Sequence, residues 1–169
     1  MKSFQNPKVL FITQAAMISA IYIVITLLFA PISYGLFQVR ISEMLTILPF
    51  FTFAAVPGLF VGALLSNIYG MAPLDIIFGS LATLIAALLT YSLRKKSKYL
   101  APVPPIVVNA LIIPFVLRYG YGVEAPIPFM MATVGAGQII ACGILGLALL
   151  KVLEKYRATL FPSSRNGNT

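Results

Sequence analysis

The stretch QVRISE, residues 38–43, and the uncharged run that follows it up to Asp75 decide how this chain folds. No residue between Glu43 and Asp75 is charged at neutral pH, so both carboxylates stand at the edges of a segment apolar enough to enter a lipid bilayer. A carboxylate that gives up its hydration near hydrocarbon usually faces a cavity, a partner or a ligand. We therefore expect Arg40, Glu43 and Asp75 to rim a pocket on the outer side of a small membrane protein.

The composition of the whole chain is that of an integral membrane protein. Of its 169 residues, 60% are hydrophobic and 9% are charged, whereas about 25% of the residues of a soluble domain are charged. The formal net charge of +8 does not indicate nucleic-acid binding, because lysine and arginine gather at the ends of apolar segments. Histidine is absent and Cys142 is the single cysteine. The common zinc sites cannot be assembled from these residues, and we expect neither a metal nor a cofactor.

Charged residues divide the chain into uncharged runs at 9–39, 44–74, 76–93, 99–117 and 125–150. A spanning helix needs about 17 to 25 apolar residues, and four of these runs are expected to hold one helix each. The run 44–74 is long enough for one overlong span or for two short spans that fold back at Val56-Pro57-Gly58. Proline removes a backbone donor there, and glycine tolerates the turn.

The placement of positive charge favours two short spans, because lysine and arginine concentrate in short cytoplasmic loops. With two spans in this run, the lysines near the N-terminus, the basic cluster 94–98 and the basic tail 151–157 all fall on one side. We therefore predict an all-α membrane protein with six transmembrane helices and both termini in the cytoplasm. The predicted domain is 1–158, followed by a polar tail at 159–169. Its helices are expected at about 9–30, 42–56, 58–70, 74–93, 104–118 and 127–150.

Small residues line one face of the first predicted helix, with Ala15, Ala16, Ser19 and Ala20 three and four positions apart. Such a patch lets helices approach closely in lipid. Ala16 and Ala20 could mark a docking face for another protein, and the alternative is packing inside the bundle. The amide of Asn109 lies near the middle of another span and needs a partner there, which is either another helix or a ligand.

Several kinds of chemistry are missing from the sequence. There is no nucleotide-binding motif of the GxxxxGK type and no Ser/His or Cys/His pair. These absences argue against an enzyme and against a protein that uses ATP by itself, and they favour a substrate-capturing subunit that takes energy from partners. Two alternatives stay open: a membrane-embedded enzyme with Glu43 and Asp75 as an acid/base pair, and a homo-oligomeric channel.

The chain resembles the QueT family, the predicted queuosine-precursor transporters, over most of residues 5–150. The motifs that carry the resemblance are QVRISE (38–43), LTILPF (45–50), LDIIFGSLAT (74–83) and PVPPIVVNA (102–110). The family belongs to the substrate-binding S components of energy-coupling factor (ECF) transporters. The resemblance implies an S-component type bundle of six helices in the plasma membrane of a prokaryote. It also implies that the protein serves in the uptake of a 7-deazaguanine such as preQ1, preQ0 or queuine.

The resemblance also implies partners and a ligand geometry. A transmembrane coupling subunit and two ATPases would assemble with the chain, and the patch at Ala16 and Ala20 would dock onto the coupling subunit. A deazaguanine presents adjacent N–H donors that a carboxylate accepts as a pair, and preQ1 also carries an aminomethyl cation. We assign the guanine-like edge to Glu43 and the cation to Asp75. Another small planar vitamin or nucleobase stays an alternative ligand.

The remaining candidate residues surround these two acids. Asn67 and Asn109 are expected to supply amide contacts to the ligand. Arg40 lies three residues before Glu43 and would pair with it on one helix face, with a direct bond to the ligand as the alternative. Phe37 and Tyr119 are the candidates for stacking on the flat face of the ligand.

Overall fold

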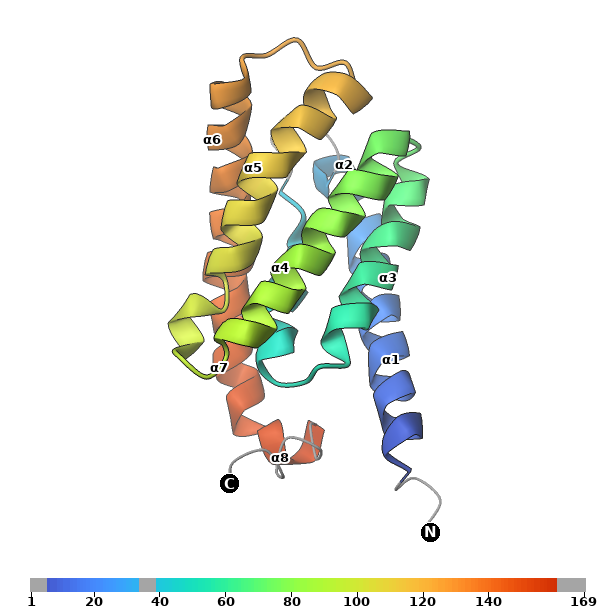
Figure 1. The fold of residues 1–169 in the computed structure, drawn as a ribbon, viewed down its shortest axis with the longest axis vertical. Coiled ribbons are helices and arrows are strands. Elements are labelled where there is room, and N and C mark those ends of the chain that lie inside the picture. Colours follow the sequence, from blue (N-terminus) through green and yellow to red (C-terminus); the bar gives the residue numbers. More distant parts are fainter. Residues whose placement is uncertain (1–5, 34–38, 161–169) are drawn as a thin grey trace.

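The computed structural model describes residues 6–33 and 39–160, and within these ranges every regular element is a helix. Figure 1 shows them as a bundle in which α1 begins and α7 ends at the same end. The α-helices are α1 (Pro7–Leu28), α2 (Ala30–Ser33), α3 (Ala55–Tyr69), α4 (Ser80–Leu93), α5 (Val103–Gly120), α6 (Ile127–Gln138), α7 (Leu147–Lys155) and α8 (Arg157–Leu160). The 3₁₀ helices are η2 (Ile41–Phe50) and η4 (Lys98–Leu100), and the π-helical turns are η3 (Asp75–Gly79) and η5 (Ile139–Gly146).

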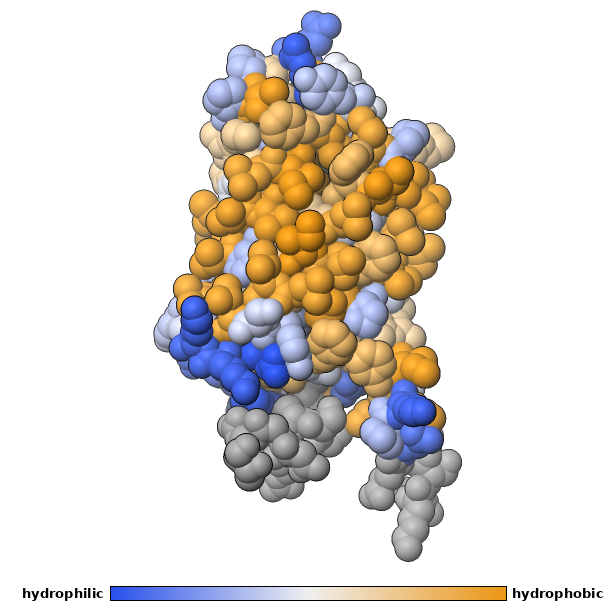
Figure 2. All heavy atoms as spheres, viewed as in Figure 1, coloured by the Kyte–Doolittle hydropathy of each residue, from blue (hydrophilic) through white to orange (hydrophobic). Residues whose placement is uncertain are grey.

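Four helical segments of the described chain are long and apolar enough to cross a membrane. They are Pro7–Leu28, Asp75–Leu93, Lys98–Gly120 and Ile127–Lys155, and two shorter apolar helices, η2 and α3, accompany them. On the face shown in Figure 2, hydrophobic residues cover the middle of the molecule and hydrophilic residues lie at both ends. These features confirm the prediction of an all-helical membrane protein, while the count of six crossings and the side of the termini stay predictions.

The predicted helix 42–56 is wrong in its type and its end, because the structure has the shorter 3₁₀ helix η2 there. Pro49 cannot donate a backbone hydrogen bond, and its ring would clash with the carbonyl of Leu45 in an α-helix. The chain turns at 51–54 and not at Pro57-Gly58. Pro57 instead occupies the first turn of α3, where backbone N–H groups have no partner within the helix.

Glycines allow α1 and α3 to pack at close range. A Cβ atom at Gly58 would lie 2.7 Å from the Ala15 carbonyl oxygen, and one at Gly62 would lie 2.9 Å from Tyr22 Cβ. The small residues of α1 therefore divide between two faces. Ala15 packs against α3, whereas Ala16 and Ala20 are exposed on the outside of the bundle.

The 3₁₀ helix η2 forms the centre of the bundle. It packs against α1, α3, α4 and η5. Seven of its ten residues are buried: Ser42, Glu43, Leu45, Thr46, Ile47, Leu48 and Pro49. Because apolar neighbours surround it on all these sides, any polar side chain that it carries must find its partners inside the protein.

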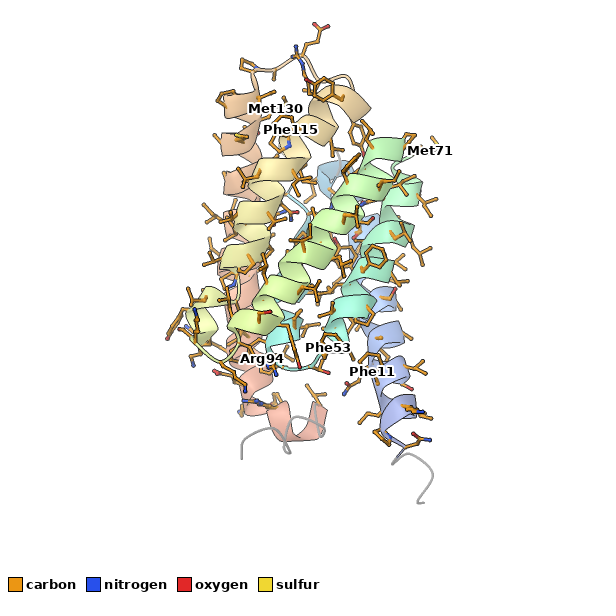
Figure 3. All side chains as sticks on the ribbon, viewed as in Figure 1. Phe11, Phe53, Met71, Arg94, Phe115 and Met130 are labelled. Carbon is orange, nitrogen blue, oxygen red and sulfur yellow. The ribbon has the colours of Figure 1, made fainter. Side chains whose placement is uncertain are left out.

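Aromatic side chains join three segments at the end of the bundle where α1 begins. The ring centroids of Phe11 and Phe53 are 6.3 Å apart, those of Phe53 and Tyr91 are 4.9 Å apart, and the Arg94 guanidinium lies 3.5 Å from the Tyr91 ring centroid. Figure 3 shows Phe11, Phe53 and Arg94 near this end and Met71 near the opposite one. These ring contacts therefore hold α1 and α4 to the turn that follows η2.

Candidate functional site

The carboxylate of Glu43 lies in the interior of the bundle and is only 1% exposed. The Tyr22 hydroxyl donates to its Oε1 at 2.5 Å, and Asn109 Nδ2 donates to its Oε2 at 3.3 Å. These partners come from α1 and α5, on two sides of η2. A carboxylate has about four acceptor positions, so each oxygen can accept from one further donor.

The backbone carbonyl of Glu43 also has partners inside the bundle. The Thr46 hydroxyl donates to the Glu43 carbonyl at 2.6 Å. Cys142 Sγ lies 3.4 Å from the same carbonyl oxygen and 3.0 Å from Gln138 Oε1. These contacts tie η2 to the long helical segment Ile127–Lys155 and give the Gln138 amide oxygen a partner inside the bundle.

The second carboxylate, Asp75, opens the π-helical turn η3 and is fully buried. Its Oδ2 accepts from Arg40 Nη2 at 3.2 Å and from the Tyr121 hydroxyl at 3.0 Å. The ion pair of Arg40 is thus with Asp75, which corrects the predicted pair with Glu43. The reason is local: η2 begins at Ile41, and Arg40 precedes it with an extended backbone, so the spacing of three residues does not place it on a shared helix face.

Asn67 lies beside Asp75 and is also fully buried. Its Nδ2 donates to the Asp75 carbonyl at 3.0 Å and to Ser80 Oγ at 3.3 Å. Within the described part of the chain, Asn67 Oδ1 and Asp75 Oδ1 have no hydrogen-bond partner. Each buried acceptor without a partner costs about 1–3 kcal/mol of folding free energy. N–H donors that reach these two oxygens would remove that cost.

The geometry of η3 makes room for the Asp75 carboxylate. A Cβ atom at Gly79 would collide with Asp75 Oδ1 and would lie 3.0 Å from Asn67 Nδ2. Glycine at 79 is therefore required by the close approach of a side chain one turn away. Single π-helical turns are frequent at functional sites, and here the turn starts at the acid itself.

The described charges of this cluster do not cancel. Glu43 and Asp75 bring two carboxylates, and Arg40 brings one guanidinium, all of them at most 4% exposed. Full ionisation leaves one negative charge in excess, which is costly inside a protein unless a cation completes it. Within the described residues, the cluster is therefore short of one positive charge and has two acceptor oxygens without a donor.

The structure separates Tyr119 from this cluster. Its side chain is 71% exposed and lines an apolar groove on the outside of α5, together with Leu74, Phe78, Leu111, Ile112, Phe115 and Val116. Tyr121, two residues later, follows the last residue of α5 and faces the interior, where its hydroxyl reaches Asp75. The predicted stacking by Tyr119 therefore has no support here, and the other stacking candidate, Phe37, lies outside the described residues.

Tyr22 and Tyr121 complete the cluster, and neither was among the candidates from the sequence. Tyr22 had a detectable signal. It lies three residues after Ser19 on the face of α1 that meets the glycines of α3, and a tyrosine hydroxyl buried in a membrane span needs a partner. Tyr121 had no such signal in the sequence. A tyrosine after Gly120, at the end of a predicted span, is equally expected as an ordinary residue of the membrane interface.

The predicted docking residues Ala16 and Ala20 lie on the least buried of the long helices. Only 22% of the apolar window of α1 is buried, against 33% to 50% for the other three long segments. The outer face of α1 therefore offers small side chains to the lipid or to another protein, away from the buried acids.

Comparisons with known proteins agree on one family. Residues 12–155 match the model of a family described as QueT transporter. A stretch of 76 residues is 34% identical to the queuosine precursor transporter QueT of Lactococcus lactis subsp. cremoris (strain MG1363). That match covers 44% of this chain and spans 45% of the relative's length. No solved structure matches the chain. Because the family model extends from the first membrane helix into α7, the chain belongs to the QueT transporter family.

Proposed function

We propose that this chain is the substrate-binding subunit of an ATP-driven ECF importer that captures a queuosine precursor from outside the cell. The ligand is a 7-deazaguanine such as preQ1, preQ0 or queuine. The name of the similar Lactococcus protein supports the substrate class. The observation that carries the proposal is the buried cluster, which gathers two carboxylates and one guanidinium from separate segments. Within the described residues, Asp75 Oδ1 and Asn67 Oδ1 of this cluster have no hydrogen-bond partner.

The proposed ligand matches the donors and charge that the cluster requires. Glu43 accepts the ring N–H and the amino group of the guanine-like edge, in the acceptor positions that Tyr22 and Asn109 leave open. Asp75 Oδ1 and Asn67 Oδ1 accept from the ammonium group of preQ1, which carries three donors and neutralises the excess negative charge. Asn109 supplies a further amide contact.

The proposed topology has six crossings with both termini in the cytoplasm of a prokaryotic cell. The four long helices cross singly, and η2 and α3 form a pair of short spans within the single domain 1–158. At about 2.0 Å per residue for a 3₁₀ helix and 1.5 Å for an α-helix, they reach about 20 Å and 22 Å, less than the hydrocarbon thickness of about 30 Å. Lys8 in the first turn of α1 and Arg94 after the end of α4 lie at the end where α1 begins (Figure 3), which supports a cytoplasmic location for that end.

The proposed partners are a transmembrane coupling subunit and two ATPases, because the sequence lacks an ATP-binding motif. Ala16 and Ala20 form the docking patch on the exposed face of α1. Docking there leaves the buried acids free to hold a ligand, and the subunit then reorients and releases it inward as the partners hydrolyse ATP.

A binding titration of the purified protein against preQ1, preQ0, queuine and guanine tests the substrate assignment. We expect the parent protein to bind a deazaguanine, and Glu43→Gln and Asp75→Asn to bind it at least tenfold more weakly, since each loses a charge-assisted contact of about 1.5–3 kcal/mol. Glu124→Gln is the matched control, because Glu124 is an exposed acid of the α5–α6 connection. Equal affinities of the parent and both correctly inserted acid variants would place the pocket elsewhere.

Transport in cells tests the docking patch. We expect Ala16→Trp with Ala20→Trp to abolish uptake and to leave ligand binding by the purified protein nearly intact. Ala132→Trp with Ala136→Trp is the matched control, because these residues are also exposed and four positions apart, on α6. Loss of binding itself would identify the patch as internal packing. Uptake without ATP would indicate a channel, and conversion of the ligand by the purified protein would indicate an enzyme.

A further inference from the structure

Tyr121 joins the connection between α5 and α6 to the buried acid of η3. It caps the C-terminus of α5, and its ring packs against a buried apolar cluster that includes Leu117 and Met130. From there its hydroxyl donates to Asp75 Oδ2 at 3.0 Å. The ring position is thus set by α5 and α6, while the hydroxyl acts on an acid 46 residues earlier in the chain.

The hydroxyl fixes the direction in which the Asp75 carboxylate faces. Arg40 Nη2 and Tyr121 Oη both donate to the same oxygen, Oδ2, from two different segments. Two donors on one oxygen hold the plane of the carboxylate and leave Oδ1 without a partner in the described structure. With Arg40 alone, the carboxylate could rotate about its χ2 torsion, whose energy well is broad.

From this geometry we infer that Tyr121 is a positioning residue for the cationic group of the ligand. It keeps Oδ1 of Asp75 turned toward the ammonium and takes no part in binding the guanine-like edge, which belongs to Glu43. The inference rests on the proposed function and deepens it, because it makes Tyr121 a determinant of selectivity between a deazaguanine with an ammonium group and one without.

The test compares two ligands that differ in this group, preQ1 with its aminomethyl cation and preQ0 with an uncharged nitrile. Their Kd values are measured for the parent protein, Tyr121→Phe and Tyr119→Phe, on detergent-solubilised protein that elutes as a single species. Tyr121→Phe keeps the packed ring and removes only the hydroxyl. Tyr119→Phe is the matched control, because that side chain is exposed on the outside of α5.

Tyr121→Phe is expected to weaken preQ1 binding about tenfold and preQ0 binding by less than about threefold, since only preQ1 uses the oriented carboxylate. Tyr119→Phe is expected to change neither Kd. Equal losses for both ligands, or no loss for preQ1, would overturn the positioning role while leaving the proposed function intact. Failure of the parent protein to bind any deazaguanine would overturn the proposed function and this inference together.

Discussion

Replacing Gly79 by alanine adds one methyl group at the point where the Asp75 carboxylate lies against the backbone of Gly79, one turn later in the same helix. The new Cβ atom would overlap Asp75 Oδ1 and would lie 3.2 Å from Asp75 Cγ and 3.0 Å from Asn67 Nδ2. All of these atoms belong to buried side chains, so the carboxylate must rotate to avoid the methyl group. Rotation moves Oδ2 away from Arg40 and Tyr121, its two donors.

The size of the effect follows from the contacts that are lost. A hydrogen bond to a charged group contributes about 1.5–3 kcal/mol, so the loss of one such bond corresponds to about a tenfold to 160-fold rise in the Kd of a cationic deazaguanine. Overpacking a buried site also costs about 1–3 kcal/mol of folding free energy. Alanine gains about 0.5–1 kcal/mol over glycine in a helix, which offsets only part of this cost.

The assay combines a binding titration with a thermal unfolding curve in the same detergent. Gly135→Ala on α6 is the matched control, because a Cβ atom there would meet nothing closer than Ala110 Cβ at 3.8 Å. We expect the control to bind as the parent does and to unfold at the same temperature or slightly higher. A Gly79→Ala protein that binds preQ1 with the parent's affinity and unfolds no earlier would refute the position assigned to the Asp75 carboxylate.

Three further substitutions test the bundle around the acids. Tyr22→Phe removes the 2.5 Å hydrogen bond to Glu43 and leaves the ring in place, so unfolding should become easier by about 1.5–3 kcal/mol; an unchanged denaturation curve would contradict this. Gly62→Ala would bring a Cβ atom within 2.9 Å of Tyr22 and force α1 away from α3, which should lower the unfolding temperature; a higher temperature would show that the two helices adjust freely. Arg40→Met leaves Asp75 without its cation, which should lower the yield of folded protein more than Arg40→Lys does, and equal yields of the two variants would argue against a structural ion pair.

Hydropathy and charge in the sequence determined the class of this protein and the acids at its centre. A lipid bilayer accepts only segments that satisfy their own backbone, so long uncharged runs must become helices whatever surrounds them. The same reasoning marks Glu43 and Asp75, because an acid at the edge of such a run needs a partner wherever it lies. Both inferences depend only on residues that are close in the sequence. The helical segments that the structure describes agree with the first of them.

Only the tertiary structure decided which groups meet. Glu43 finds its partners 21 and 66 residues away, in Tyr22 and Asn109, and no local pattern encodes such a contact. Whether Tyr119 or Tyr121 reaches the acids depends on how the C-terminal end of α5 packs in the bundle, and the apolar residues on both sides of that helix do not reveal it. In lipid both faces of a span are hydrophobic, so packing between helices, and not hydropathy, selects the side chains that share a site.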